Sequence, residues 1–197
     1  MSKNVLPLFP SSLSFFTVND VEELDVNKFE FMETFFDDGS CTSIRIDVLD
    51  DYPQLKKIIK DNFEKFATET LHYQQDFRVT TSWFTKVKPN ISTNFHNHKN
   101  CFYSGVYYFQ DHTEKSGKIE FKNPLMEFSS YHIIPKEYDL HSSSSWSINP
   151  QKGLMLFFPS YLYHRVTKHF EDRVRYSLAF NLVPDGSYGM RDSTYVI

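Results

Sequence analysis

Cysteine is scarce in this sequence, with 2 residues in a chain of 197. Two cysteines in a chain of this length do not make a disulfide framework. We therefore expect Cys41 and Cys101 to be free thiols. Cys101 stands three residues after His98, and we interpret it as a small buried packing residue rather than a metal ligand.

Concentrated positive charge and long apolar runs are also missing. The formal net charge is -4 and no block of lysine or arginine exceeds two residues, so the electrostatic footprint of nucleic-acid binding is absent. We therefore expect no nucleic-acid partner. The sequence has no run of about 18 apolar residues and no basic segment leading into an apolar one at its start. We expect neither secretion nor membrane spanning, and a cytoplasmic location.

Aromatic residues, by contrast, are abundant. They make up 17% of the chain, and 20 residues are Phe. Aromatic side chains pack well on the pleated surface of a sheet, so the composition favours a mainly β fold. A chain of 197 residues is long enough to bury one sizeable core, and we expect a single domain over residues 1–197.

One segment has the pattern of a helix. The apolar residues of 53–68 follow the i, i+3, i+4 spacing of an amphipathic helix. Asp50 and Asp51 precede it and are expected to supply acidic or capping groups at its start. Nearer the N-terminus, apolar residues mix with proline, and 13–18 suit an edge strand or an arm.

From residue 78 onward the sequence consists of short β-branched and aromatic runs separated by turn residues. Such runs predict a β-sandwich or barrel. The seven predicted strands are 79–87, 103–109, 118–121, 131–134, 146–148, 154–158 and 174–183.

His96 and His98 stand two residues apart, shortly before the aromatic run 103–109. Residues at i and i+2 share one face of a strand, so both imidazoles can reach one metal ion if that face looks inward. A third histidine, His164, follows the apolar run and proline turn of 153–160, at the head of a further strand. It can return another imidazole to the first two, although a histidine bonded to backbone is the simpler interpretation of His164 alone.

Arg175 and Ser177 are a second pair at i and i+2, so a guanidinium and a hydroxyl share a strand face and could bind a carboxylate together. A surface salt bridge from Arg175 to Glu171 or Asp172 is the simpler alternative. Arg175 lies beside the largely apolar run 176–183, however, and a buried arginine needs an anionic partner. The pair therefore indicates an anion site.

These features resemble the 2-oxoglutarate and iron(II)-dependent oxygenase superfamily, and within it a group of compact single-domain members. The resemblance spans residues 83–183. Its marks are His96-Asn97-His98, residues 104–109, residues 153–160 with His164, and residues 175–181. In that superfamily the distal histidine is followed by an Arg-x-Ser pair that holds the distal carboxylate of the cosubstrate. Arg175 follows His164 by eleven residues, so order and spacing match.

The resemblance implies a double-stranded β-helix, which is a cupin-like jelly-roll barrel, with the helix 53–68 on its outer side. It divides the chain into an N-terminal arm with a packing helix (1–77), a catalytic β-barrel core (78–185) and a C-terminal tail (186–197).

The usual superfamily ligands are His-x-Asp or His-x-Glu together with the distal histidine, and this chain lacks that acid. His98 stands two residues after His96, and Asn100 two residues after His98. We favour His96, His98 and His164 as the metal ligands over His98, Asn100 and His164.

A carboxylate distant in sequence could also complete the site, and Glu120 and Asp111 are the nearest downstream. If neither does so, a neutral ligand replaces the usual anionic one, and the iron keeps more net positive charge.

By the same resemblance, the protein would bind Fe(II) and use 2-oxoglutarate and O2 to hydroxylate a small-molecule or protein substrate, forming succinate and CO2. Arg175 and Ser177 would hold the distal carboxylate of 2-oxoglutarate. Two alternatives stay open. One is a three-histidine cupin-type metalloenzyme that does not use 2-oxoglutarate, and the other is a noncatalytic binding module built on the same barrel.

The remaining histidines show no paired spacing, and we expect loop or surface positions for them. They are His72, His112, His132, His141 and His169. Four aromatic residues could line a cosubstrate pocket or belong to the core, and only alternate residues of 103–109 can face inward. They are Trp83, Tyr103, Tyr107 and Tyr108.

Overall fold

The computed structural model describes residues 8–126, 131 and 133–196. Within these ranges the fold is mainly β, as predicted, with one α-helix, α1 (Pro53–Glu69), and short 3-10 helices at Val26–Lys28, Val48–Asp51 and Arg191–Ser193. The strands are β1 (Ser14–Thr17), β2 (Phe31–Glu33), β3 (Cys41–Ser43), β4 (Phe77–Val87), β5 (Tyr103–Tyr107), β6 (Ile119–Lys122), β7 (Ser145–Ile148), β8 (Leu154–Pro159), β9 (His164–Val166), β10 (Arg175–Pro184), β11 (Ser187–Tyr188) and β12 (Tyr195–Val196).

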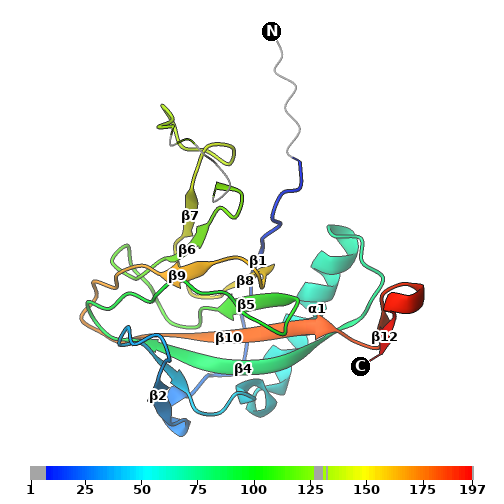
Figure 1. Cartoon of the computed structure of the whole chain (residues 1–197). Coiled ribbons are helices and arrows are strands. Elements are labelled where there is room, and N and C mark those ends of the chain that lie inside the picture. Colours follow the sequence, from blue (N-terminus) through cyan, green and yellow to red (C-terminus); the bar gives the residue numbers. More distant parts are fainter. Residues whose placement is uncertain (1–7, 127–130, 132, 197) are drawn as a thin grey trace.

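The strands form two principal sheets, which lie one above the other in Figure 1. The larger has seven strands in the order β1-β8-β5-β10-β4-β3-β2, and the smaller has three in the order β7-β6-β9. Strands β11 and β12 pair separately. Among the described residues the two sheets do not join into one closed barrel.

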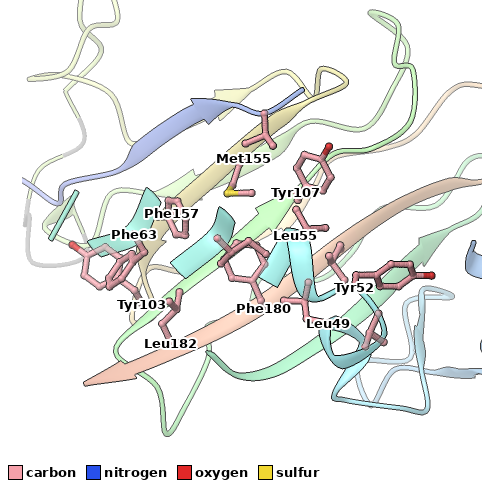
Figure 2. Close-up of a cluster of buried hydrophobic side chains, with 14 of the residues drawn as sticks. Leu49, Tyr52, Leu55, Phe63, Tyr103, Tyr107, Met155, Phe157, Phe180 and Leu182 are labelled. Atoms are coloured by element: carbon pink, nitrogen blue, oxygen red, sulfur yellow. The ribbon is translucent and has the colours of Figure 1, made fainter. Parts of the chain in front are cut away.

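Helix α1 covers one face of the seven-stranded sheet. Its apolar residues Leu55 and Phe63 are fully buried, and they pack in one cluster with Tyr103, Phe157 and Phe180 of the sheet (Figure 2). Phe63 contacts Phe157 with ring centroids 5.3 Å apart. The predicted amphipathic helix thus buries its apolar side against the sheet, on the outside of the two-sheet assembly.

Strand β8 shows that both faces of the large sheet are covered. Met155 and Phe157 belong to the cluster under α1, whereas Leu156 and Phe158 pack with Phe121 of β6 in the space between the two sheets. Successive residues of a strand point to opposite faces, so a continuous apolar run is what a strand buried on both sides requires. Phe158 also lines the cavity between the two sheets that holds the candidate site residues.

One predicted strand is wrong. The segment 131–134 lies between β6 and β7, where Tyr131, Ile133 and Ile134 are outside the strands and 79%, 77% and 76% exposed. His132 lies outside the described residues. β-branched and aromatic residues favour a strand only where they can pair with a neighbouring strand and pack against an apolar surface. The other six predicted strands are present, with ends that agree within two residues.

The start of α1 also differs from the prediction. Asp50 and Asp51 do not cap it, because their carboxylates pair with Lys56 and Arg45. The carboxylate of Glu22 takes that role and accepts hydrogen bonds from the backbone N–H groups of Gln54 (3.1 Å) and Leu55 (3.2 Å).

The N-terminal region contributes to the main sheet. Strand β1 lies at one edge, as expected for 13–18, while β2 and β3 form the other edge beside β4. The sheet therefore extends beyond the predicted core 78–185, and the division of the chain into arm, core and tail stays a prediction. Within the described ranges, the helices are too short or too polar to cross a bilayer.

Candidate metal centre and anion pocket

Backbone hydrogen bonds bring His96, His98 and His164 together in the space between the two sheets. His96 and His164 form an antiparallel bridge, in which each backbone N–H donates to the other residue's carbonyl at 3.0 and 2.8 Å. The N–H of His98 donates to the carbonyl of Ser160 at 3.0 Å. His98 is therefore anchored to the turn that follows β8, and His164 opens β9.

The three imidazoles converge on one point. One ring nitrogen from each lies within 4.8 Å of the others, and Nε2 of His98 is 3.2 Å from Nε2 of His164. The ring centroids of His96 and His164 are 4.5 Å apart. Among the described residues this is the one group of three or more His, Cys, Asp or Glu side chains placed to hold a metal ion.

Hydrogen bonds to backbone orient two of these rings. Nδ1 of His96 donates to the carbonyl of Asn94 and Nδ1 of His164 to that of Leu162, each at 2.9 Å. Their Nε2 atoms therefore carry lone pairs that point into the cluster. A carbonyl on the far nitrogen is the usual means of fixing a metal-binding tautomer.

Burial keeps the cluster neutral. It lowers the pKa of all three histidines, to about 4 for His98 and well below the ordinary value for the nearly buried His164. The positive charge of one protonated ring would also disfavour protonation of its neighbours. At neutral pH the cluster therefore presents uncharged imidazoles, the form that binds metals.

Aromatic side chains surround the cluster. The ring of Phe36 lies 4.9 Å from that of His96, Trp83 lies 5.5 Å from His98, and Phe158 lies 4.7 Å from His164. These walls restrict water near the imidazoles and strengthen electrostatic interactions there.

The alternative ligands named from the sequence lie elsewhere. Asn100 is exposed and does not line the cavity that holds the three histidines. Glu120 accepts hydrogen bonds from Arg165 at 2.7 Å and Ser145 at 3.0 Å, and Asp111 is an exposed residue 3.8 Å from Lys152. The geometry thus favours His96, His98 and His164 as the ligand set over His98, Asn100 and His164.

Both cysteines are free thiols, as expected. Cys101 is half-buried, with its Sγ 3.4 Å from the carbonyl of Lys99, and it does not line the cavity of the histidine cluster.

Arg175 lies at the start of β10, is only 2% exposed and has no carboxylate partner among the described residues. Its Nη1 donates to the hydroxyl of Ser177 at 3.3 Å, and its guanidinium carbon lies 5.3 Å from the ring centroid of Tyr108. The suggested surface salt bridge is wrong, because Glu171 pairs with Arg173 instead. Arg175 is thus a buried cation without a counter-charge.

Two further residues complete the surroundings of Arg175. Thr85 stands opposite Ser177 in the β4–β10 pairing, and their hydroxyls are 2.6 Å apart. Tyr108 is fully buried on the inner face, whereas Tyr103 and Tyr107 belong to the cluster under α1. The alternation of residues 103–109 pointed to this division. Thr85 carried no signal in the sequence, because only the strand pairing places it beside Ser177.

A single cavity of about 660 Å³ joins the two groups. Its walls include the three histidines, Arg175 and Ser177, together with Thr85, Trp83 and Tyr108. A neutral three-imidazole cluster and a buried cation therefore face the same space, which is the arrangement needed for an anionic ligand that also reaches a metal.

Residues 81–181 match the family described as "Putative 2OG-Fe(II) oxygenase". The match covers just over half of the chain, and the chain belongs to this family. The enzyme is thus an oxidoreductase of the class that uses Fe(II), 2-oxoglutarate and O2. The resemblance, the enzyme class and the two cofactors expected from the sequence are confirmed at this level.

Solved structures of such oxygenases share the fold. A prolyl-4-hydroxylase from Pseudomonas putida is 15% identical with a TM-score of 0.53, over 80% of this chain and 79% of that one. HygX from Streptomyces hygroscopicus, with nickel, 2-oxoglutarate and hygromycin B bound, is 9% identical with a TM-score of 0.57, over 88% and 83%. The carbocyclase SnoK from nogalamycin biosynthesis is 13% identical with a TM-score of 0.57, over 85% and 74%.

At these identities the likeness shows the fold alone. The predicted double-stranded β-helix is confirmed, in the form of two facing sheets. No curated protein matches the chain.

Proposed function

We propose that the protein hydroxylates a C–H bond of its substrate while converting 2-oxoglutarate to succinate and CO2. In this proposal His96, His98 and His164 bind Fe(II), and Arg175 and Ser177 hold the distal carboxylate of 2-oxoglutarate. The main observation in its favour is the shared cavity. A neutral three-imidazole cluster and a buried guanidinium, which has no carboxylate partner among the described residues, both line it.

The histidine cluster fits an iron site in its donors and their orientation. Three imidazole nitrogens that converge on one point would hold Fe(II), while Arg175 and Ser177 line the same cavity and would receive the distal carboxylate of the cosubstrate. Bound Fe(II) would supply the redox chemistry, while the chain positions the reactants and excludes water. Because all three ligands are neutral, the iron keeps its full double charge and attracts an anionic cosubstrate more strongly.

The anion site fits a carboxylate. Burial lowers the pKa of Arg175, but a guanidinium titrates above about 12 and stays charged at neutral pH. An unpaired buried charge is unfavourable. A ligand carboxylate would bind favourably because it would form two parallel hydrogen bonds with the guanidinium and would neutralise that charge. Ser177 and Thr85 add hydroxyls on the same strand face.

The mouth of the cavity suggests which part of a substrate enters. Met32, Phe36 and Ile46 line it and remain 43%, 43% and 59% exposed. Exposed apolar side chains around a cavity commonly mark a ligand site. The proposal therefore places an apolar group of the substrate beside the ring of Phe36, next to the histidine cluster.

The decisive experiment measures binding and turnover on one preparation. Protein purified without oxygen or chelators is titrated with Fe(II) and then 2-oxoglutarate, followed by the visible absorption that develops when both bind together. Oxygen is then admitted, and succinate is measured with and without candidate substrates. We expect one iron per chain, a saturable 2-oxoglutarate signal and slow succinate release. An iron-loaded protein that binds no 2-oxoglutarate would overturn the proposal.

That same outcome would support a second candidate, a three-histidine metalloenzyme that uses no 2-oxoglutarate. The observation in its favour is the absence of a carboxylate from the cluster formed by the described residues. In that case Arg175 would bind a carboxylate of the substrate itself. Failure to bind iron at all would leave the noncatalytic binding module.

A further inference from the structure

We propose that His112 is a positioning residue of the anion pocket, which steadies Tyr108 and the guanidinium of Arg175 as a neutral acceptor and so leaves the positive charge free for the cosubstrate. The inference rests on the proposed function, because it concerns the same carboxylate site. A chain of hydrogen bonds runs from Glu171 through Ser116 to His112.

Glu171 is a firmly ionised carboxylate. It accepts hydrogen bonds from the backbone N–H and hydroxyl of Thr113 at 3.1 and 2.9 Å, from Arg173 at 2.5 Å, and from the hydroxyl of Ser116. Burial acts to raise the pKa of Glu171, but these hydrogen bonds outweigh it and lower the pKa to about 2. At neutral pH Glu171 can only accept.

This fixes the tautomer of His112. Ser116 has a single hydroxyl proton, which it donates to Glu171, so its oxygen can only accept from its other neighbours. One of these is Nδ1 of His112, at 3.3 Å. Nδ1 must therefore carry the hydrogen, and Nε2 of the neutral ring is left with a lone pair.

Four buried side-chain atoms of the described residues have no hydrogen-bond partner: Oε2 of Glu22, Nε2 of His112, the hydroxyl of Tyr108 and Nε of Arg175. The last three belong to side chains that lie next to one another. The rings of Tyr108 and His112 meet edge to face at 5.5 Å, and the guanidinium of Arg175 lies 5.3 Å from the same Tyr108 ring. One acceptor and two donors are thus gathered behind the cavity wall.

Orphaned buried polar atoms are rare in folded proteins and call for a reason. A carboxylate at position 112 would satisfy both donors but would also neutralise Arg175 and compete with the cosubstrate. Neutral imidazole accepts without that effect. Burial, and next the charge of Arg175, lower the pKa of His112 to about 4, so the ring stays neutral.

His169 provides the contrast within the same region. It is buried, whereas His112 is half-buried. Nδ1 of His169 accepts from the N–H of Gly117 at 3.3 Å, and its Nε2 donates to the carbonyl of Arg173 at 2.8 Å. Both nitrogens of His169 are used by backbone, which is a structural role. His112, by contrast, has one buried nitrogen without a hydrogen-bond partner among the described residues, and its ring contacts that of Tyr108.

The first test needs no substitution. In protein labelled with ¹⁵N-histidine, the two ring nitrogens of His112 are observed at pH 7. We expect a protonated Nδ1 and an unprotonated Nε2, whereas a protonated Nε2 would overturn the inference. In Ser116→Ala the constraint on Nδ1 is lost, and we expect a mixture of the two tautomers.

The second test separates charge from packing, using 2-oxoglutarate affinity of anaerobic, iron-loaded protein. His112→Gln supplies a neutral acceptor, and we expect affinity within about threefold of wild type, since a neutral hydrogen bond is modest in strength. His112→Glu introduces a competing carboxylate, and we expect a loss of about 30-fold or more. Circular dichroism and iron content establish that both variants fold.

Equal affinities for the Gln and Glu variants would overturn the inference. The proposed function would survive that result as long as the wild-type protein binds 2-oxoglutarate and Arg175→Met does not. Absence of 2-oxoglutarate binding by the wild-type protein would instead reject the proposed function.

Discussion

Nε2 of His98 lies 3.2 Å from Nε2 of His164, with the two rings inclined by only 5°. Nδ1 of His164 donates to a backbone carbonyl, so its Nε2 holds a lone pair and His98 must carry the hydrogen between them. Two nitrogens bound side by side to one metal at about 2.1 Å would be about 3 Å apart. The metal-free spacing is therefore close to that of a chelating pair, and binding a metal through Nε2 of His98 requires only that its hydrogen move to Nδ1.

His164 is the ligand on which the proposed iron site depends most. It is nearly buried and touches both other imidazoles. His164→Ala is expected to abolish stoichiometric Fe(II) binding, measured by metal analysis of anaerobically loaded protein, while circular dichroism shows an unchanged fold.

The matched control for this experiment is His141→Ala, because His141 is exposed in a loop and does not line the cavity of the cluster. It should bind one iron per chain. Iron content in His164→Ala equal to that of the control would reject the site.

The ligand register is tested by comparing three neighbouring positions. His96→Ala and His98→Ala should weaken Fe(II) binding by similar factors, because each removes one neutral ligand from the same ion. Asn100→Ala should bind Fe(II) like wild type, since Asn100 is exposed outside the cavity. Normal Fe(II) binding by His96→Ala together with weak binding by Asn100→Ala would instead support His98, Asn100 and His164 as the ligands.

The pKa shifts of the buried histidines predict how stability depends on pH. Burial lowers the pKa of His98 from 6.5 to about 4. Between pH 6.5 and pH 4 the unfolded chain therefore binds a proton at this histidine and the folded chain does not. The free energy of unfolding of the metal-free protein should therefore fall as pH drops from about 6.5 towards 4. For His98 alone the change is on the order of 3 kcal/mol.

Urea denaturation of metal-free protein at several pH values measures this dependence. His98→Gln should make it less steep, because glutamine does not titrate and only the other histidines whose pKa is lowered by burial still contribute. An unfolding free energy that is constant from pH 7 to pH 5 in the wild-type protein would contradict the prediction.

Much of the site could be predicted from the sequence because its key residues come in close pairs. His96 with His98 and Arg175 with Ser177 each share a strand face at a spacing visible in the sequence. Only one contact between residues distant in sequence, that of His164 with the pair His96 and His98, then remained to be predicted. The alternation of 103–109 likewise separated Tyr107 from Tyr108.

Residues whose role depends on a distant partner could not be predicted. Thr85 meets Ser177 only through the pairing of β4 with β10, and Glu22 caps a helix that begins 31 residues later. His112 lies in the loop between β5 and β6, as expected, but the contact of its ring with Tyr108 could not be predicted. The short edge strands β2 and β3 were missed because three residues give too little alternation to recognise.

Arg175 is proposed to hold the distal carboxylate of 2-oxoglutarate, and its substitution gives the sharpest test of the anion site. Truncating one partner of a desolvated, hydrogen-bonded charge pair costs on the order of 2–5 kcal/mol. Arg175→Met should therefore weaken 2-oxoglutarate binding by roughly 30-fold or more. Met fills part of the space without charge, and Fe(II) binding should survive.

Ser177→Ala provides a graded comparison at the same pocket. It removes one hydroxyl that lies 3.3 Å from Nη1 of Arg175 and 2.6 Å from the Thr85 hydroxyl. A hydrogen bond to a charged group contributes about 1.5–3 kcal/mol, so the loss of affinity should be smaller than for Arg175→Met. Calorimetric titration of anaerobic, iron-loaded protein measures both. Wild-type affinity in Arg175→Met would show that the carboxylate binds elsewhere, and the buried guanidinium would then need another anion.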